Sequence, residues 1–233
     1  MNSITKKIFA ALSAGMLLMS AVGCDSDDSD SSNESENNLV ENAADNINMG
    51  EDELPYGSTL TQVLPKNDDS ILIGIEYDNR FVTLDEAKAL SNYVASINNC
   101  DGELLEKTFY KPRLDFILEN QGVTDAGEYL KTIHENIADN YINDEFDFNY
   151  VLIEDCFDES YDDSQTGFSS IDNFIAEKAG QETVDKITSR KLVQYDIQYT
   201  PDSEPGSAYM FSRRSNTSSR MYIYTIDGVC YIL

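Results

Sequence analysis

The feature that most constrains the fold of this chain is an abrupt change of composition at Cys24. Residues 8–22 form an uncharged, largely apolar run that two lysines precede. This run of about 15 residues is shorter than the roughly 20 that a permanent membrane-spanning helix needs, and it has the features of a secretory signal. Residues 25–55 then hold 11 acidic side chains and no basic one. A folded core is therefore expected only after this acidic tract.

The segment that ends at Cys24, with the sequence LLMSAVGC, resembles the lipobox of bacterial lipoproteins. In that family the cysteine is lipidated and becomes the first residue of the mature protein. The resemblance implies that residues 1–23 are a lipoprotein signal peptide and that Cys24 is the lipidation site. Because two acyl chains anchor a protein stably, it also implies attachment to the cell membrane on its extracytoplasmic face. The alternative is an ordinary cleaved signal in which Cys24 has no role.

The tract of residues 24–55 is expected to be a disordered acidic stalk. It consists mainly of Asp, Glu, Ser and Asn, so it cannot bury enough apolar surface to offset the entropy of ordering. Repulsion between its like charges extends such a segment further. Residues 56–233 are long enough for one hydrophobic core, and we expect them to form a single domain.

The chain is strongly acidic, with a formal net charge of −27. Residues 56–233 alone hold 32 acidic and 14 basic side chains. This charge excludes nucleic acid and anionic lipid headgroups as partners, because both would be repelled. Cationic ligands, divalent cations and neutral glycans stay compatible, and the simplest interpretation is solubility at a crowded cell surface.

The first half of the domain is predicted to be helical. Thr83 and Glu86 have the spacing of a capping box, and an apolar face at helical spacing follows as far as Asn99. Further helices are expected through residues 104–109, from Lys111 to a stop at Gly122, and after a cap at Asp125.

The second half is predicted to contain most of the strands. In residues 193–199 apolar and polar side chains alternate, which is typical of a strand with one solvated face. Asp227-Gly228 predicts a two-residue hairpin that pairs Tyr224 with Tyr231 and Thr225 with Cys230. Other strands are expected at 71–75 (an edge strand or a lead-in segment), 148–153, 209–212 and 221–226, with an acidic loop at 158–167 and a short helix at 171–179.

The order of elements from Thr83 to the final hairpin, IDGVCYIL, resembles that of the nuclear transport factor 2-like superfamily. The resemblance implies an α+β fold in which N-terminal helices pack inside a curved antiparallel sheet, the cystatin-like cone. Isomerases and dehydratases of that superfamily use an Asp or Glu inside the cone as base, with a Tyr or second acid at the oxyanion. Asp196 and Glu154 are the conceivable bases here, but alternation places Asp196 on the polar face.

Other sequence features give weak indications of chemistry. His134 is the only histidine, so no His-based zinc cluster exists, and no motif indicates a cofactor. The segment 158–173 faintly resembles a calcium loop, but Asn173 stands where a bidentate Glu is expected, and an acidic turn around Asp162 is the better interpretation. Six tyrosines lie in the predicted strands: Tyr195, Tyr199, Tyr209, Tyr222, Tyr224 and Tyr231. We expect them to line a pocket, to form a sugar-binding surface or, as is more common for such stripes, to pack in the core.

Three cysteines are left once Cys24 is lipidated. An exported chain forms disulfides, but with Cys100, Cys156 and Cys230 at most one internal bond is possible. Cys156 and Cys230 are the better candidates, because both lie in or near predicted strands. Burial of all three as small apolar residues is the alternative.

These observations predict a lipid-anchored extracytoplasmic protein whose domain binds a small molecule, a glycan or a protein without catalysis. An enzyme of the isomerase or dehydratase kind is the first alternative, and a purely structural surface protein is the second. The catalytic alternative requires a buried carboxylate beside a tyrosine hydroxyl.

Overall fold

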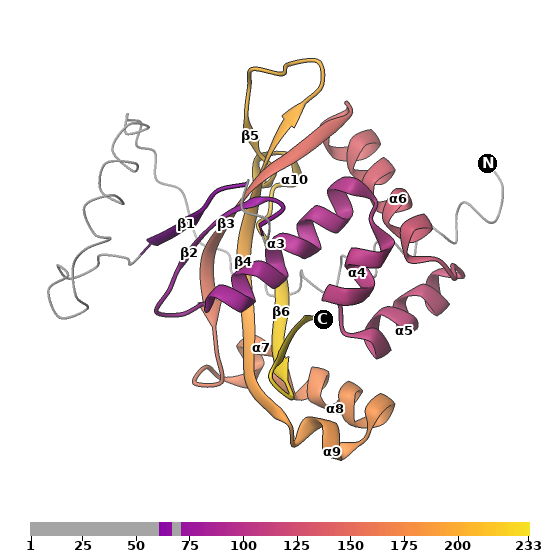
Figure 1. The fold of residues 1–233 in the computed structure, drawn as a ribbon, viewed down its shortest axis with the longest axis vertical. Coiled ribbons are helices and arrows are strands. Elements are labelled where there is room, and N and C mark those ends of the chain that lie inside the picture. Colours follow the sequence, from indigo (N-terminus) through magenta and orange to yellow (C-terminus); the bar gives the residue numbers. More distant parts are fainter. Residues whose placement is uncertain (1–60, 67–70) are drawn as a thin grey trace, which may run out of the picture.

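The computed structural model describes residues 61–66 and 71–233 and shows one sheet covered by helices (Figure 1). The predicted signal peptide, Cys24 and the predicted stalk lie outside the described residues. The strands are β1 (Thr61–Leu64), β2 (Gly74–Asp78), β3 (Phe146–Phe157), β4 (Ile187–Pro201), β5 (Tyr209–Met210), β6 (Ser219–Ile226) and β7 (Val229–Ile232). The helices are α3 (Leu84–Asn99), α4 (Gly102–Thr108), α5 (Lys111–Gln121), α6 (Ala126–Ile137), the π-helix η2 (Ala138–Ile142), α7 (Asp163–Thr166), α8 (Phe168–Ala179), α9 (Gln181–Val184) and α10 (Ser212–Ser215). The predicted α+β class is confirmed.

The sheet is open and mixed. Its strand order is β1-β2-β3-β4-β6-β7, and β5 pairs with β4 beside this path. Strands β2 and β3 are parallel, whereas the other pairs are antiparallel. The expectation of a wholly antiparallel sheet is therefore wrong at this pair. The physical reason is the long helical connection α3–α6, since two parallel strands need a crossover of a dozen or more residues.

Local signals in the helical half are confirmed. Thr83 Oγ1 accepts a hydrogen bond from the Glu86 amide at 3.4 Å, and Glu86 Oε2 accepts one from the Thr83 amide at 2.8 Å. Helix α3 ends at Asn99, as predicted. Gly122, with φ of 69°, ends α5, and Asp125 caps α6 through the Glu128 amide.

The predicted hairpin is also confirmed. Asp227 and Gly228 have φ of 53° and 78°, as a type I′ turn requires, and the register pairs Tyr224 with Tyr231 and Thr225 with Cys230. Two strand predictions need correction. The segment 71–75 is not an edge strand, because β2 lies between β1 and β3; residues 71–73 lead into β2, which begins at Gly74. The strand expected at 209–212 ends at Met210 and gives way to α10.

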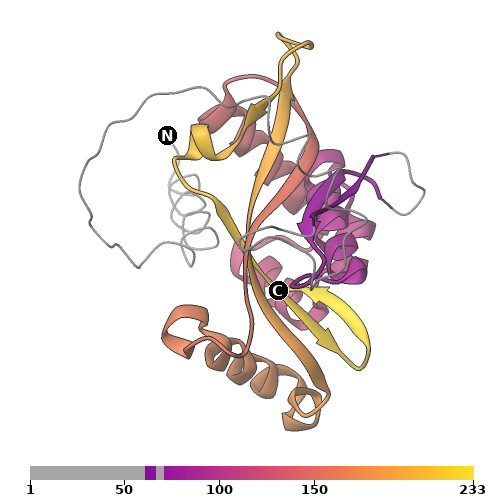
Figure 2. The same ribbon diagram turned by 90° about the vertical axis from the view of Figure 1, so that its left-hand side faces the viewer.

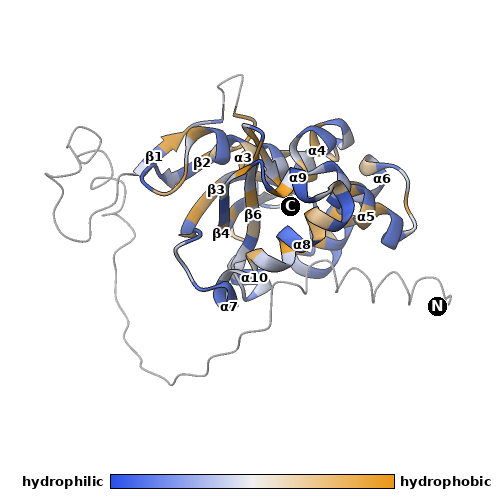
Figure 3. Ribbon diagram, turned by 90° about the horizontal axis from the view of Figure 1, so that it is seen from below, coloured by the Kyte–Doolittle hydropathy of each residue, from blue (hydrophilic) through white to orange (hydrophobic). Residues whose placement is uncertain are grey.

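Hydrophobic clusters lie on both faces of the central strands. Helices α3 to α6 cover one face, where Val193 and Ile223 belong to the larger cluster. Helix α8 covers the other face, where Leu192 and Tyr224 join Ile175 in a second cluster. Figure 2 shows α8 at the lower end of the long strand β4, and Figure 3 shows hydrophobic residues, in orange, along both strands and helices. Two cores therefore flank one sheet, and polar side chains between the layers need partners.

Candidate functional site

The most deeply buried ion pair joins the start of α3 to strand β4. Lys191 Nζ lies 2.7 Å from Glu86 Oε2 and 2.5 Å from the Phe81 carbonyl oxygen, to both of which it donates. Only 2% of the Glu86 side chain and 15% of the Lys191 side chain are exposed. The hydroxyl of Ser189 donates to Glu86 Oε1 at 3.2 Å. Such a pair in a low-dielectric setting is a candidate for chemistry or for a structural clamp.

The hydrogen-bond geometry favours a clamp. Glu86 is the capping-box residue of α3, so its carboxylate already accepts from the Thr83 amide before the sheet supplies Ser189 and Lys191. Each charged group therefore has partners within the chain, and burying either charge alone would be costly. The arrangement fixes the beginning of α3 against β4.

Two cysteines flank this clamp. Cys156 Sγ donates to the Phe81 carbonyl oxygen at 3.7 Å, and Cys230 Sγ lies 3.3 Å from Thr225 Oγ1. Burial raises the pKa of the Cys156 thiol to about 12 and also raises the pKa of Cys230. Both thiols interact electrostatically with Glu86 and Lys191. They are protonated at neutral pH and are poor nucleophiles there.

The structure does not form the predicted Cys156–Cys230 disulfide. Both residues are free thiols, as is Cys100. Cys156 lies on β3 and Cys230 on β7, and β4 and β6 stand between these strands. Three strand spacings of about 4.8 Å exceed the roughly 7 Å between Cα atoms that a disulfide spans. Sequence position on strands was therefore an insufficient guide to pairing.

We expect Cys156 to react with iodoacetamide at pH 8 about three orders of magnitude more slowly in the folded chain than in the urea-unfolded chain. The reason is that a pKa of about 12 leaves a thiolate fraction of about 10⁻⁴, against about a quarter for an unperturbed thiol. Mass spectrometry of the labelled peptides over time measures the rates. As the control for a disulfide, the urea-unfolded chain is labelled without reductant. Free thiols all react under these conditions, whereas cysteines joined in a disulfide do not. Equal rates in the folded and unfolded chain would contradict the prediction.

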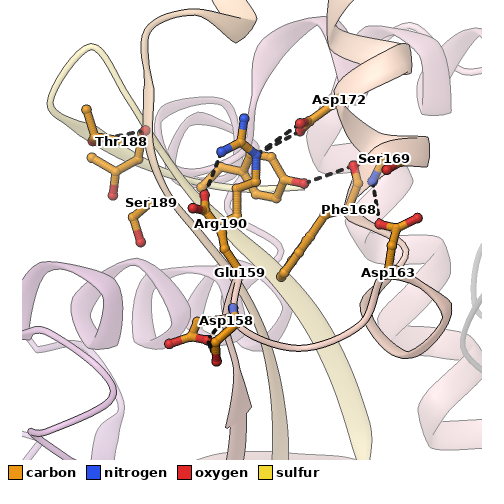
Figure 4. A network of polar contacts seen from close by, with 12 residues as sticks. Asp158, Glu159, Asp163, Phe168, Ser169, Asp172, Thr188, Ser189 and Arg190 are labelled. Carbon is orange, nitrogen blue, oxygen red and sulfur yellow. Dashed lines mark hydrogen bonds and ion pairs between the residues drawn. The ribbon is translucent and has the colours of Figure 1, made fainter.

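A second polar cluster joins α8 and the loop after β3 to the opposite face of β4 (Figure 4). Arg190 Nε lies 3.1 and 3.0 Å from the two carboxylate oxygens of Asp172, and its Nη1 lies 2.5 Å from Glu159 Oε1. The Tyr224 hydroxyl donates to the Phe168 carbonyl oxygen at 3.5 Å. Because one guanidinium serves two carboxylates, this cluster joins the layers and has one negative charge in excess.

The candidate bases do not form a catalytic pair. Asp196 is 4% exposed, so its expected place on a solvated face is wrong. Its Oδ1 accepts from the amides of Ile197 and Ser212, and the Ser212 hydroxyl donates to its Oδ2. The reason for the burial is that β5 and α10 cover this part of β4. Glu154 is exposed on β3 and accepts from Gln194 Nε2 at 3.3 Å.

His134 and the acidic loop have packing and capping roles. The His134 ring stacks on Phe146 with centroids 4.4 Å apart and an interplanar angle of 13°. Asp162 Oδ1 accepts from the Ser164 amide and caps α7, as an acidic turn does. Across residues 61–66 and 71–233, no group of three or more His, Cys, Asp or Glu side chains has the arrangement to hold a metal ion.

The tyrosine stripe is divided between the two cores. Tyr195 and Tyr199 are buried in the larger cluster, and Tyr224 is buried in the second. Tyr222 and Tyr231 pack against that second cluster, and Tyr209 packs against Tyr199 with ring centroids 5.9 Å apart. The core-packing interpretation of these residues agrees with this placement.

Sequence reasoning missed the cations. Lys191 and Arg190 are adjacent in β4 and point to opposite faces, each to a carboxylate from a different layer. The available signal was two adjacent basic residues, Arg190 and Lys191, shortly before the predicted strand of residues 193–199.

No protein-family model, curated protein or solved structure matches this chain. None of the helices among the described residues is long and apolar enough to cross a membrane.

Proposed function

We propose that this chain is a lipoprotein, anchored to the cell membrane through lipid on Cys24, whose extracytoplasmic domain binds a partner without catalysis. The observation that carries the anchoring is the apolar run that ends at Gly23-Cys24 and gives way at once to an acidic tract. The acidic tract would then be a stalk that holds the domain away from the membrane. The resemblance to the nuclear transport factor 2-like cone belongs to the same proposal.

The state of the buried acids supports binding over catalysis. Glu86 is paired with Lys191, Asp172 with Arg190, and Asp196 with Ser212. A general base must be free to take a proton from a substrate, and each of these carboxylates already accepts hydrogen bonds from its own chain. Using any of them as a base would break a contact between layers of the fold.

Exposed apolar side chains near the start of α3 support a protein partner. Phe81 is 53% exposed and Leu84 is 45% exposed, and both lie beside the Glu86–Lys191 clamp. Val229, 49% exposed, precedes Cys230, which is close enough to Asp85 for its charge to act on the thiol. Large exposed apolar side chains of this kind are candidates for contacts with a protein partner.

One contact favours the enzymatic alternative. The Tyr150 hydroxyl donates to Glu76 Oε2 at 3.0 Å between β3 and β2, which brings together the residue types that such an enzyme uses, with Glu76 half-buried. Burial, followed by the charge of Glu76, raises the pKa of Tyr150, so this hydroxyl stays protonated and can donate. If a substrate that this pair isomerises or dehydrates were found, the enzymatic alternative would replace the binding proposal.

The anchoring is tested on the protein purified from membranes of its host. Mass spectrometry of the N-terminal peptide is expected to show a mature chain that begins at Cys24 and carries acyl groups. A mature chain that begins elsewhere, or a Cys24 without lipid, would refute the lipoprotein proposal.

A further inference from the structure

Arg113 is a partly buried cation that no acid of the described chain neutralises. It lies in the first turn of α5, and its guanidinium carbon is 5.0 Å from the centroid of the Phe174 ring on α8. The same carbon is 5.8 Å from the centroid of Phe116, one turn further along α5. The two rings meet edge to face with centroids 5.4 Å apart. Arg113 therefore lies against an aromatic corner between two helices.

One polar atom of this side chain, Nε, is buried and not satisfied. Within residues 61–66 and 71–233, Arg113 Nε is buried and has no hydrogen-bond partner, and no ion pair includes its guanidinium. An unpaired buried donor costs free energy, and a charge costs more. Arg190 and Lys191, two other cations that are partly buried, each have a carboxylate within 3.0 Å. A chain with this excess of acids leaves Arg113 without one.

The groups around Arg113 carry charges of both signs, but none of the acids among the described residues forms an ion pair with it. Desolvation lowers the pKa of Arg113, and the ionisable groups that act on it next are the hydroxyls of Tyr222 and Tyr129. The Tyr222 hydroxyl donates to the Thr166 carbonyl oxygen at 2.7 Å. A second cation, Lys178 Nζ, lies 5.5 Å from the centroid of Phe116 and is paired with Glu177 Oε1 at 3.4 Å. Arg113 therefore differs from Lys178 at this corner, because Lys178 has a carboxylate partner and Arg113 has none among the described residues.

We propose that Arg113, with the Phe116 and Phe174 rings, binds the carboxylate of a small organic acid with an apolar or aromatic body. A guanidinium has a planar fork of donors that matches a carboxylate, and the rings supply apolar surface beside it. The net charge of −27 repels every anion, and a dianion more strongly than a monoanion, so a ligand with a single negative charge fits better. The proposal gives the binding function a ligand class and rests on that function.

The test uses the full chain in detergent and benzoate as the probe, with binding followed by calorimetry and by NMR. Wild type is expected to bind benzoate, and Arg113→Gln is expected to weaken the affinity about tenfold or more. Arg213→Gln removes an exposed arginine of α10 and is the matched control, with unchanged affinity expected. Benzamide has the shape of benzoate but no charge. Its affinity for wild type is expected to be no higher than the affinity of benzoate for the Arg113→Gln chain.

Any of three binding results would overturn the proposal: no binding of benzoate to wild type, equal binding to Arg113→Gln, or inorganic phosphate bound in preference to benzoate. Folding is checked with Arg113→Met, which keeps the apolar stem. Its melting temperature is expected to match or exceed that of wild type, since an unpartnered cation is removed. A large decrease would show that the guanidinium is structural and would also overturn the proposal. The anchoring at Cys24 is measured separately, so a negative benzoate result does not bear on it.

Discussion

Replacing Cys24 by Ser is expected to remove the protein from the membrane or to leave it unprocessed with its signal attached. Without the thiol no acyl chains are added, and each methylene of those chains contributes about 0.8 kcal/mol to membrane binding. Among the described residues no helix offers a second way to span the bilayer. The measurement is the distribution of the chain between membrane and soluble fractions, together with its electrophoretic mobility.

The matched controls are the Cys100→Ser, Cys156→Ser and Cys230→Ser variants. These three cysteines lie in the described domain as free thiols, so their replacement is expected to leave membrane retention unchanged. Retention of the Cys24→Ser chain in membranes, with the mobility of wild type, would refute lipidation at Cys24. Loss of retention in one of the control variants would instead place the attachment on the domain.

Local structure was predictable because its causes lie within a few residues. The capping box at Thr83 and the left-handed turn at Gly228 each need only neighbouring groups, and both are found as expected. The α+β class follows from the same local periodicities. Element type and hairpin register are therefore the part of this fold that a single sequence determines.

Long-range structure was not predictable from those signals. Strand β2 pairs in parallel with β3, although more than 60 residues of helix and loop separate them, and no local pattern encodes that choice. Asp196 alternates with apolar residues as a solvated side chain would, yet α10 and β5 return to cover it. Burial on both faces of β4 depends on which segments come back to the sheet.

The same limit applies to the candidate sites. Glu86 and Lys191 are separated by 105 positions, and Arg113 meets Phe174 from a different helix. A lysine or an arginine in an acidic sequence has many possible partners, so only the fold shows that Lys191 is paired and that Arg113 is not. Cys156 and Cys230 are the opposite case, since the sequence favoured them as partners and the fold keeps them apart. Similar strand positions do not imply proximity when two strands lie between them.

The Lys191→Met variant is expected to lose about 3–5 kcal/mol of unfolding free energy, which is the typical cost of breaking a buried ion pair by removing one partner. The cost arises because Glu86, with 2% of its side chain exposed, is left without its counter-charge. Glu86→Gln is expected to have a similar effect through Lys191, while Gln keeps the capping box at Thr83 intact. Urea unfolding of the full chain, followed by circular dichroism, measures both.

The double variant decides whether this contact is a clamp. Combining Lys191→Met with Glu86→Gln removes both charges, so its cost is expected to be well below the sum of the two single costs, as for residues in direct contact. Lys186→Met is the control, since this lysine of the turn before β4 is 57% exposed and its pair with Asp227 spans 3.9 Å. Its expected cost is at most about 1 kcal/mol. Additive costs, or single variants as mild as this control, would show that the Glu86–Lys191 pair does not hold α3 to the sheet.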